Sequence, residues 1–383
     1  MKITSKSQIK KGSKFHLSNF NKMFCEEETK KYKIYEYPNF KNKLFWKKSI
    51  KFENKGKILI ISGPARSGNH LLLSLLDGHP SIQHHPGEDD FLRSIFTEAN
   101  KSEINLIKKL KSKNNWKFML SLSGQAPFGK QKGFNKWKKL FYSNSKNYIW
   151  SGKQKEGAGH IYDYQGIKTK IKYYEYEKYL RRKGEKIARC NNFLEIFSIY
   201  LDAIKKLYYK KSYNLKYHHV WFGSGLRREL KFLLERNKNI VCLVPIRKFE
   251  TFYYSYSLSR HKTKKIQQHA LNDLWEHWRH KVIDYLILKK KYPANIIIIQ
   301  YEDLVYNPKF AIQKISKKLG IKFSKKTMIP TIFNKRTKGN STYGRTNKDL
   351  GKIYRSSAEY DFPKNILTDE YHQIIKLVKK FSV

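Results

Sequence analysis

The sequence predicts an α/β protein built around a parallel β-sheet. Three short apolar runs, at residues 58–61, 240–246 and 295–300, have the composition of strands that are buried on both faces. Stretches with helical periodicity separate these runs, and an alternation of strands and helices is typical of a parallel sheet. We therefore expect one α/β domain over residues 57–383, preceded by an N-terminal extension over residues 1–56.

The individual elements follow from periodicity and from turn residues. A glycine-bounded loop after the first strand leads into a compact apolar helix, which is the opening of a βαβ unit. Residues 100–190 contain many glycines and little periodicity, so we expect an insertion there. Gly320 has the position of a helix C-cap. Beyond the three apolar runs, we expect a strand at 82–85 and helices at 71–76, 88–99, 191–209, from 249, 266–290, 308–319 and 368–381.

The chain is strongly basic, with 80 Lys and Arg against 31 Asp and Glu and a net charge of +49 over 383 residues. Lys greatly outnumbers Arg, and Asn, Ile, Tyr and Phe are also abundant. These are residues of A+T-rich codons, so composition bias accounts for much of the charge. A field of this sign nevertheless steers anionic ligands toward the protein.

Cysteine usage and hydropathy exclude several classes of protein. Three cysteines without a Cys-x-x-Cys pair cannot form a disulfide framework or a structural zinc module. The N-terminus has no signal-peptide pattern, and no stretch approaches the ~18 apolar residues of a membrane span. These observations favour a soluble cytoplasmic protein without a membrane span.

The loop after the first strand has the spacing of a phosphate-binding loop. Gly63 and Gly68 are separated by four residues, and the loop enters a helix, whose first N–H groups and dipole can bind an anion. A nucleotide triphosphatase follows its second glycine with Lys and then Ser or Thr, which bind phosphates and Mg²⁺. Asn69 and His70 occupy those places, which disfavours a nucleotide kinase. The alternative is an ordinary tight turn between a strand and a helix.

This segment, which reads Pro-Ala-Arg-Ser-Gly-Asn-His-Leu-Leu, resembles the 5′-phosphosulfate loop of sulfotransferases that use 3′-phosphoadenosine 5′-phosphosulfate (PAPS). The resemblance implies a three-layer fold like that of P-loop NTPases. It also implies that Arg66 holds the bridging oxygen of the leaving phosphate, and that Ser67, Gly68, Asn69 and His70 bind the 5′-phosphate. Asn and His are departures from the Thr residues that family members usually carry, so the role of His70 is left open.

A second segment resembles the 3′-phosphate motif of the same family. Arg247 ends the strand at 240–246, and Ser255 lies eight residues further along the next helix. Arg provides a planar fork that matches phosphate, and a Ser hydroxyl adds a neutral donor. The alternative is an Arg at a strand end that is solvated.

Two further segments resemble the family. Gln300-Tyr-Glu-Asp-Leu, followed by Pro308, matches a motif that we interpret as structural, with carboxylates that cap the next helix. A late segment around residues 336–342 resembles the loop that closes over the 3′-phosphate and the adenine. The resemblance implies that Arg336, Lys338 and Gly339 bind the cofactor there, and a glycine permits a close approach of the backbone.

Sulfuryl transfer requires a base for the acceptor hydroxyl, and family members place His or Glu after the second strand. Glu88 matches this position best, and His84 or His85 is the alternative. A further alternative is that the acidic residues here only offset a helix dipole. His84 and His85 alternate in an extended strand, so they do not suggest a metal site. His219 or Trp221, in a segment that lacks the family's Lys-Thr-Pro, either lines the acceptor site or packs in the core.

The resemblance thus implies a sulfotransferase that moves a sulfuryl group from PAPS to an acceptor hydroxyl, without a metal, and releases 3′-phosphoadenosine 5′-phosphate (PAP). Tyr, Trp and Lys between residues 120 and 180 suit a glycan acceptor, and a solvated loop is the alternative. A nucleic-acid-binding protein is the other functional class, which the charge permits. No helix-turn-helix, RNP or zinc-finger signature supports it, so we expect no specific nucleic-acid partner.

Overall fold

The structure is a computed structural model of the chain, and it describes most of the α/β domain. The described residues are 57–88, 91–122, 148–150, 169–171, 173–206, 217–221, 227–260, 268–332, 335–337, 350–355, 362 and 368–383. The expected N-terminal extension, together with Lys338 and Gly339, lies outside these residues.

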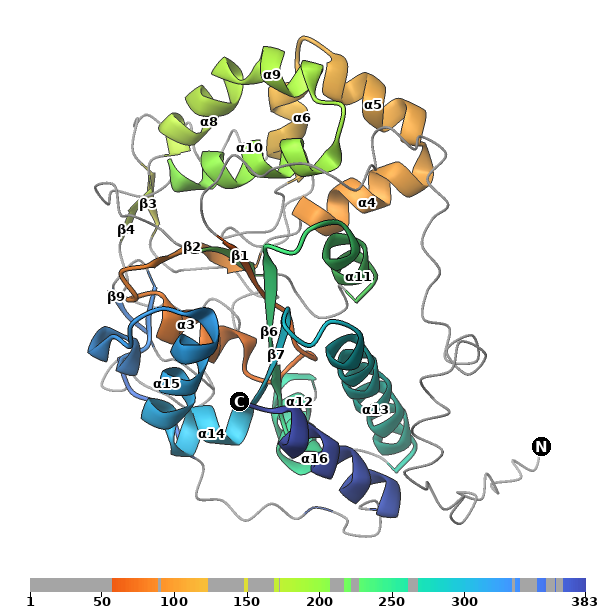
Figure 1. The fold of residues 1–383 in the computed structure, drawn as a ribbon, viewed down its shortest axis with the longest axis vertical. Coiled ribbons are helices and arrows are strands. Elements are labelled where there is room, and N and C mark those ends of the chain that lie inside the picture. Colours follow the sequence, from red (N-terminus) through yellow and green to blue (C-terminus); the bar gives the residue numbers. More distant parts are fainter. Residues whose placement is uncertain are drawn as a thin grey trace, which may run out of the picture.

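A parallel sheet forms the centre of the protein (Figure 1), as predicted, and it has five strands. The strand order is β2-β5-β1-β6-β7, so β1 lies in the middle and β2 at one edge. The strands β1, β6 and β7 are almost wholly buried, which explains their continuous apolar sequences. The bounds are β1 (Lys57–Ile61), β2 (Ile82–Glu88), β5 (Tyr217–Trp221), β6 (Ile240–Ile246) and β7 (Ile296–Gln300).

Strand β5 is the element of the sheet that the sequence reasoning missed. It pairs in parallel with β1 on one side and with β2 on the other. Its sequence, Tyr-His-His-Val-Trp, lacks the apolar run that identified its neighbours. His219 and Trp221, which we considered for the acceptor site, are therefore strand residues of the sheet.

Helices cover both faces of the sheet, which gives the predicted three layers. Figure 1 shows α3 and α15 on one side of the strands, and α11 and α13 on the other. Helix α15 has the predicted bounds and ends at Gly320, whose φ of 64° is left-handed. The helices of these layers and of the C-terminal half are α3 (Asn69–Leu76), α11 (Arg227–Arg236), α12 (Phe249–Arg260), α13 (Gln268–Lys291), α14 (Tyr301–Tyr306), α15 (Pro308–Leu319) and α16 (Asp369–Phe381).

The segment between β2 and β5 contains more helix than its sequence suggested. We placed no helix between residues 100 and 190, whereas the described part of this range contains several. The helices there are too short to show a clear period, and polar side chains join them. Asn115 Nδ2, for example, donates to Leu110 O and to Gly184 O. The helices are α4 (Phe91–Lys101), α5 (Glu103–Lys111), α6 (Asn115–Leu122), α8 (Tyr173–Arg182), α9 (Gly184–Arg189) and α10 (Phe193–Lys205).

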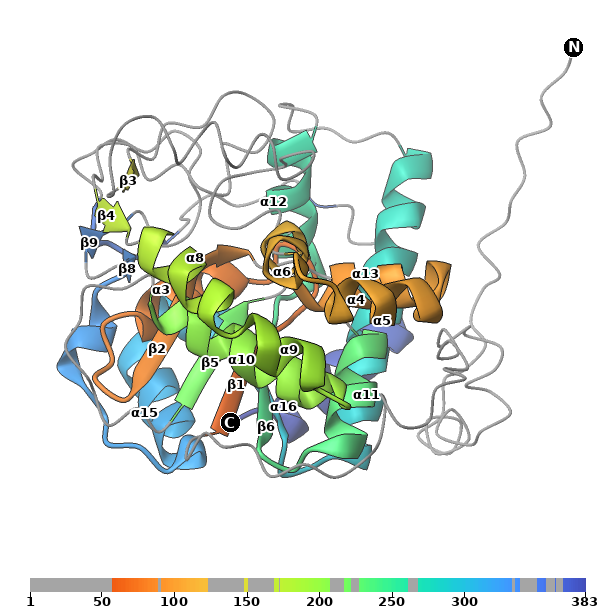
Figure 2. The ribbon, with the colours of Figure 1, turned by 90° about the horizontal axis from the view of Figure 1, so that it is seen from above.

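These helices form one group beside the sheet, and Figure 2 shows α8, α9 and α10 of this group in front of it. Aromatic rings hold the group in place. The rings of Phe91 and Tyr200 stack with their centroids 3.8 Å apart, and Phe96 meets Phe193 and Phe232 edge to face. Because Phe232 belongs to α11, the cluster joins the inserted helices to a helix of the main domain.

Short elements complete the described structure. Two antiparallel strands, β3 (Tyr148–Trp150) and β4 (Thr169–Ile171), pair with each other within the insertion. A short 3-10 helix, η1 (Lys325–Met328), precedes a second small pair, β8 (Thr331–Ile332) and β9 (Lys335–Arg336). Within the described ranges, no helix is long and apolar enough to cross a bilayer.

Candidate functional site

The loop between β1 and α3 is shaped by close contacts at its first glycine. A Cβ atom at Gly63 would lie 2.3 Å from the carbonyl oxygen of Pro245, so only glycine fits beside the end of β6. The buried side chain of Asn69 then ties the loop together. Its Oδ1 accepts a hydrogen bond from Gly63 N at 2.8 Å, and its Nδ2 donates to the carbonyl oxygens of Gly63 and Pro64, both at 3.2 Å. Any contact of Asn69 with an anion would therefore come from its backbone N–H.

The second glycine of the loop lies against the Gln300-Tyr-Glu-Asp-Leu segment. Gly68 has a φ of 95°, which is left-handed, and a Cβ there would lie 2.3 Å from Cδ2 of Tyr301. Arg66 also has a positive φ, of 63°. Such a conformation is uncommon for a residue with a side chain, and strained residues of this kind cluster at active sites and ligand-binding loops.

Ser67, between these two residues, is fully buried. Its Oγ has no hydrogen-bond partner among the described residues. An unpaired buried hydroxyl is costly unless a ligand or water completes it, so Ser67 Oγ is suited to a polar ligand. His70 is half-buried on the first turn of α3.

Arg247 lies beside this loop, directly after β6. Its Nη1 donates to the carbonyl oxygen of Arg66 at 3.3 Å, and its guanidinium carbon lies 4.2 Å from the centre of the Tyr301 ring. Its Nε is buried and, in the part of the chain that the structure describes, has no partner. Trp278 Nε1 donates to the backbone oxygen of Arg247 at 2.8 Å. The guanidinium is thus held by a hydrogen bond and by the Tyr301 ring, while its buried Nε has no partner within the described ranges.

The site therefore lies where β1, β6 and β7 end, since Tyr301 follows β7 directly. The carboxyl ends of parallel strands meet at one edge of the sheet, which is the usual ligand-binding edge of such folds. Tyr301 and Trp278 were not among the residues predicted for the site. Tyr301 stood inside a motif that we interpreted as structural, and no sequence signal pointed to Trp278.

Glu302 fixes the helix that follows Arg247. Its Oε1 accepts hydrogen bonds from Lys248 N and from Thr251 Oγ1, both at 3.1 Å. These donors belong to the start of α12, so the expectation that the motif caps the next helix along the chain is wrong for Glu302. Burial is the main cause that raises the pKa of this carboxyl above its ordinary value, against a smaller lowering by the Lys248 N–H.

An aromatic cluster packs against the start of α12. Phe249 packs against Trp275 and Trp278 of α13, and Trp278 in turn packs against Tyr371 of α16. The hydroxyl of Tyr371 donates to Glu250 Oε2 at 2.5 Å. The first turn of α12, which follows Arg247, is therefore held by α13, by α16 and, through Glu302, by α14.

Two further predicted residues, Ser255 and Arg336, lie on other elements of the fold. Ser255 is half-buried on α12, two turns after Arg247. Arg336 is exposed on β9, where its Cδ would lie 3.0 Å from a Cβ at Gly351, a residue with a φ of 81°.

Glu88 is the last residue of β2, where it pairs with Trp221 of β5 across an irregularity in the ladder. It does not begin a helix, as we had expected, because α4 starts only at Phe91. The strand extends further than its apolar residues indicated. Because β2 runs parallel to the other strands, Glu88 lies at the same edge of the sheet as Arg247 and the loop after β1.

Comparison with known proteins places this arrangement in a family. The family model described as "Sulfotransferase family" matches residues 59–325. No curated protein matches the chain. Among the described residues, no group of three His, Cys, Asp or Glu side chains could hold a metal ion.

Solved structures similar to the chain include two sulfotransferase domains. One comes from the olefin synthase of Synechococcus PCC 7002, with 15% identity, a TM-score of 0.43 and coverage of 88% of this chain and 98% of that domain. The other belongs to the curacin biosynthetic pathway, with 14% identity, a TM-score of 0.44 and coverage of 85% and 98%.

The packing of Tyr301 on Gly68 predicts a large effect of one methyl group. Gly68→Ala should lower the free energy of unfolding by roughly 2–4 kcal/mol, because the new Cβ would be strained at positive φ and would overlap the ring. Urea denaturation measures this change. Gly184→Ala is the control, since a Cβ there would meet only Asn115 Oδ1 at 3.3 Å. Equal midpoints for the Gly68→Ala variant and the wild type would contradict the packing.

The raised pKa of Glu302 predicts how stability depends on pH. The folded state binds this proton more tightly than the unfolded state, so the stabilisation is complete below the ordinary pKa of 4.5 and is lost as pH rises through the folded value. Glu302→Gln keeps the acceptor oxygen and removes the titration. Its unfolding free energy relative to the wild type should therefore increase as pH rises above about 4.5.

Glu276→Gln provides the matched control for this measurement. The hydrogen bond from His280 is the main cause that lowers the pKa of Glu276, so the same comparison should change in the opposite direction. Urea denaturation between about pH 4 and pH 8 measures both variants. Parallel pH profiles for the two variants would show that the charge of Glu302 is not buried.

Proposed function

The chain belongs to the sulfotransferase family, and on that premise we propose that it takes a sulfuryl group from PAPS and transfers it to an acceptor hydroxyl. The observation that carries the proposal is a pair of buried polar atoms at the carboxyl edge of the sheet, Ser67 Oγ and Arg247 Nε, which have no partner among the described residues. Both are hydrogen-bond donors. A doubly phosphorylated nucleotide has the acceptor oxygens that such donors require.

On the 5′ side, the loop offers several donors to a phosphate. The backbone N–H groups of Gly68, Asn69 and His70 lie at the start of α3, where the helix dipole favours an anion. Ser67 Oγ adds a buried hydroxyl donor. Arg66 adds the positive charge, which suits the bridging oxygen of the leaving phosphate.

On the 3′ side, Arg247 would bind the second phosphate, with Ser255 on the following helix. The contact of its guanidinium with the Tyr301 ring restrains the side chain before a ligand arrives, so less side-chain entropy is lost on binding. Arg336, Lys338 and Gly339 would complete the nucleotide site from the late loop. The hydrogen bond from Arg247 to the backbone of Arg66 joins the two phosphate sites.

When bound, PAPS supplies the sulfuryl group. The chain supplies the proton acceptor and the positive charge. Glu88 would remove the proton of the acceptor hydroxyl, since β2 ends at the same edge as the loop. Arg66 would stabilise the negative charge that develops on the phosphate oxygen. Asn69 and His70 stand where a kinase has the Lys and the Mg²⁺-binding Ser or Thr, which supports transfer without a metal.

The acceptor is proposed to be a glycan. The described part of the insertion carries aromatic rings beside cations, which suits a sugar with anionic groups. The guanidinium of Arg181 lies 4.8 Å from the centre of the Trp116 ring, and Lys117 Nζ lies 5.4 Å from it. Lys109 Nζ lies 5.2 Å from the Phe118 ring.

The proposed nucleotide site predicts a loss of PAP binding in two variants. Arg66→Ala and Arg247→Ala should each weaken binding by roughly 10- to 150-fold, because each removes a charge-assisted hydrogen bond to a phosphate. Arg247→Lys should also bind weakly, since Lys cannot replace the Nε donor of the fork. Calorimetry with PAP measures all three. Arg189→Ala removes an equal charge from the exposed surface of α9 and should bind PAP like the wild type. Undiminished binding by the Arg66 and Arg247 variants would overturn the assignment.

The proposed base predicts a variant that binds the nucleotide and does not turn over. Glu88→Gln should lower kcat by about 10²- to 10⁴-fold while its affinity for PAP stays that of the wild type. Transfer of labelled sulfate from PAPS to a panel of glycan, lipid and phenolic acceptors measures the rate and identifies the acceptor. Glu103→Gln on α5 is the control. Full activity of Glu88→Gln, with activity lost in His84→Gln or His85→Gln, would instead make a histidine the base.

A further inference from the structure

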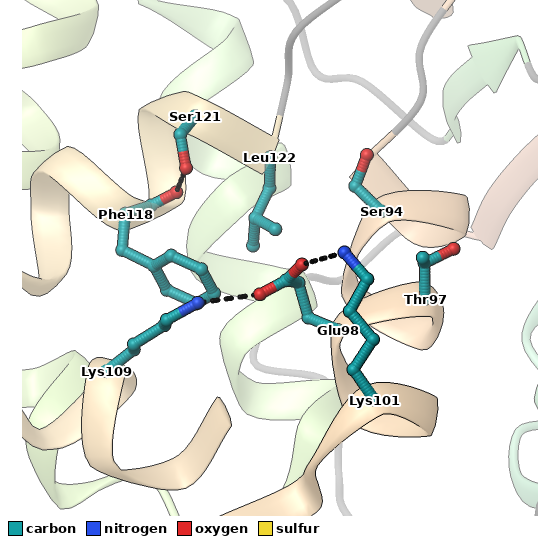
Figure 3. Close-up of a pocket in the computed structure, with 8 residues that line it drawn as sticks. All are labelled: Ser94, Thr97, Glu98, Lys101, Lys109, Phe118, Ser121 and Leu122. Carbon is teal, nitrogen blue, oxygen red and sulfur yellow. Dashed lines mark hydrogen bonds and ion pairs between the residues drawn. The ribbon is translucent and has the colours of Figure 1, made fainter. Parts of the chain in front are cut away.

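A polar hollow lies between α4 and α6 of the insertion. On α4, Ser94, Thr97, Glu98 and Lys101 form a stripe at helical spacing, while the opposite face of that helix is buried in the core. On α6, the facing residues are Phe118, Ser121 and Leu122, and α5 contributes Lys109. The cavity between them has a volume of about 480 Å³ (Figure 3). This lies within the range of small-molecule sites.

The charges of this cavity favour an anionic ligand. Figure 3 shows Glu98 between two lysines, with one carboxylate oxygen 2.7 Å from Lys109 Nζ and the other 3.1 Å from Lys101 Nζ. The hydrogen bond from Lys109 is the main cause that lowers the pKa of Glu98, so this carboxyl is ionised at neutral pH. Two lysines against one carboxylate leave a positive excess. Each ammonium also has three N–H donors, of which Glu98 engages one.

The other groups of the cavity suit a sugar. Ser94 and Thr97 line one wall, and Glu98 can accept hydrogen bonds from sugar hydroxyls. The opposite wall holds the Phe118 ring and the buried Leu122, which can cover the C–H face of a pyranose. A neutral apolar molecule would leave the positive excess of the two lysines uncompensated, and a simple inorganic anion would leave the apolar wall uncovered.

The cavity is also near the proposed base along the chain. Helix α4 begins three residues after Glu88, and the six residues from Glu88 to Ser94 span at most about 20 Å. A chain of several sugars held in the cavity could therefore extend toward the end of β2. We propose that the cavity between α4, α5 and α6 binds an acidic sugar unit of the acceptor glycan, at a distance from the sugar that is sulfated. This inference rests on the proposed glycan sulfotransferase function.

Binding of a hyaluronan tetrasaccharide, which alternates an acidic and a neutral sugar, tests the proposal. Calorimetry at a fixed salt concentration should show binding by the full chain, and Lys101→Ala/Lys109→Ala should weaken it by about tenfold or more. Lys108→Ala/Lys111→Ala is the matched control, since it removes the same charge from exposed positions of α5 outside the cavity. It should change the affinity by less than about twofold. Cellotetraose, which is neutral, should bind at least about tenfold more weakly than hyaluronan.

Three results would overturn the proposal. The first is an equal loss of affinity in the two double variants, because that would mean non-specific attraction. The others are equal affinity for the neutral sugar and for hyaluronan, and no binding of hyaluronan at all. PAP binding, measured in the same samples, separates this inference from the proposed function. Wild-type PAP binding without lysine-dependent sugar binding refutes the cavity alone. Lysine-dependent sugar binding without PAP binding refutes the PAPS assignment and supports the sugar site.

Discussion

The contact between Tyr301 and Gly68 is the constraint on which the rest of the site depends. One face of the ring carries the guanidinium of Arg247, and the ring also fills the space that a side chain at residue 68 would need. The residue that follows β7 thereby sets the positions of the loop after β1 and of the arginine after β6. Glu302, the next residue, fixes the start of α12. One strand end thus aligns two others.

The parts of this structure that could be predicted from sequence are those that depend on local pattern. Strand β6 is apolar throughout and β7 is apolar up to its last residue because both their faces are covered, and α15 carries its proline and glycine at its two ends. Strand β5 is equally central, yet its polar composition concealed it. The site shows the same division. Arg66 and Arg247 follow from motifs, whereas the role of Trp278 depends on a contact across 31 residues that no local pattern encodes.

The charge of the chain has two separate consequences. Most of the +49 comes from lysines spread along the chain, but Arg247 at the sheet edge is held in a defined position. Lys101 and Lys109 show an intermediate case, since one carboxylate organises both. A basic protein therefore attracts anions in general through its field and selects among them through the few cations whose geometry is fixed.

The place of β5 in the sheet also bears on how the chain is made. Strand β1, at the centre, has β5 and β6 as its neighbours, and about 150 residues or more separate it from either of them along the chain. A nascent chain that has passed β1, β2 and the inserted helices still lacks every strand that β1 pairs with. The apolar strand β1 therefore has no partner strand while the insertion is synthesised. A protein with this topology exposes an aggregation-prone segment early and covers it late, which makes its biosynthesis dependent on protection of that segment.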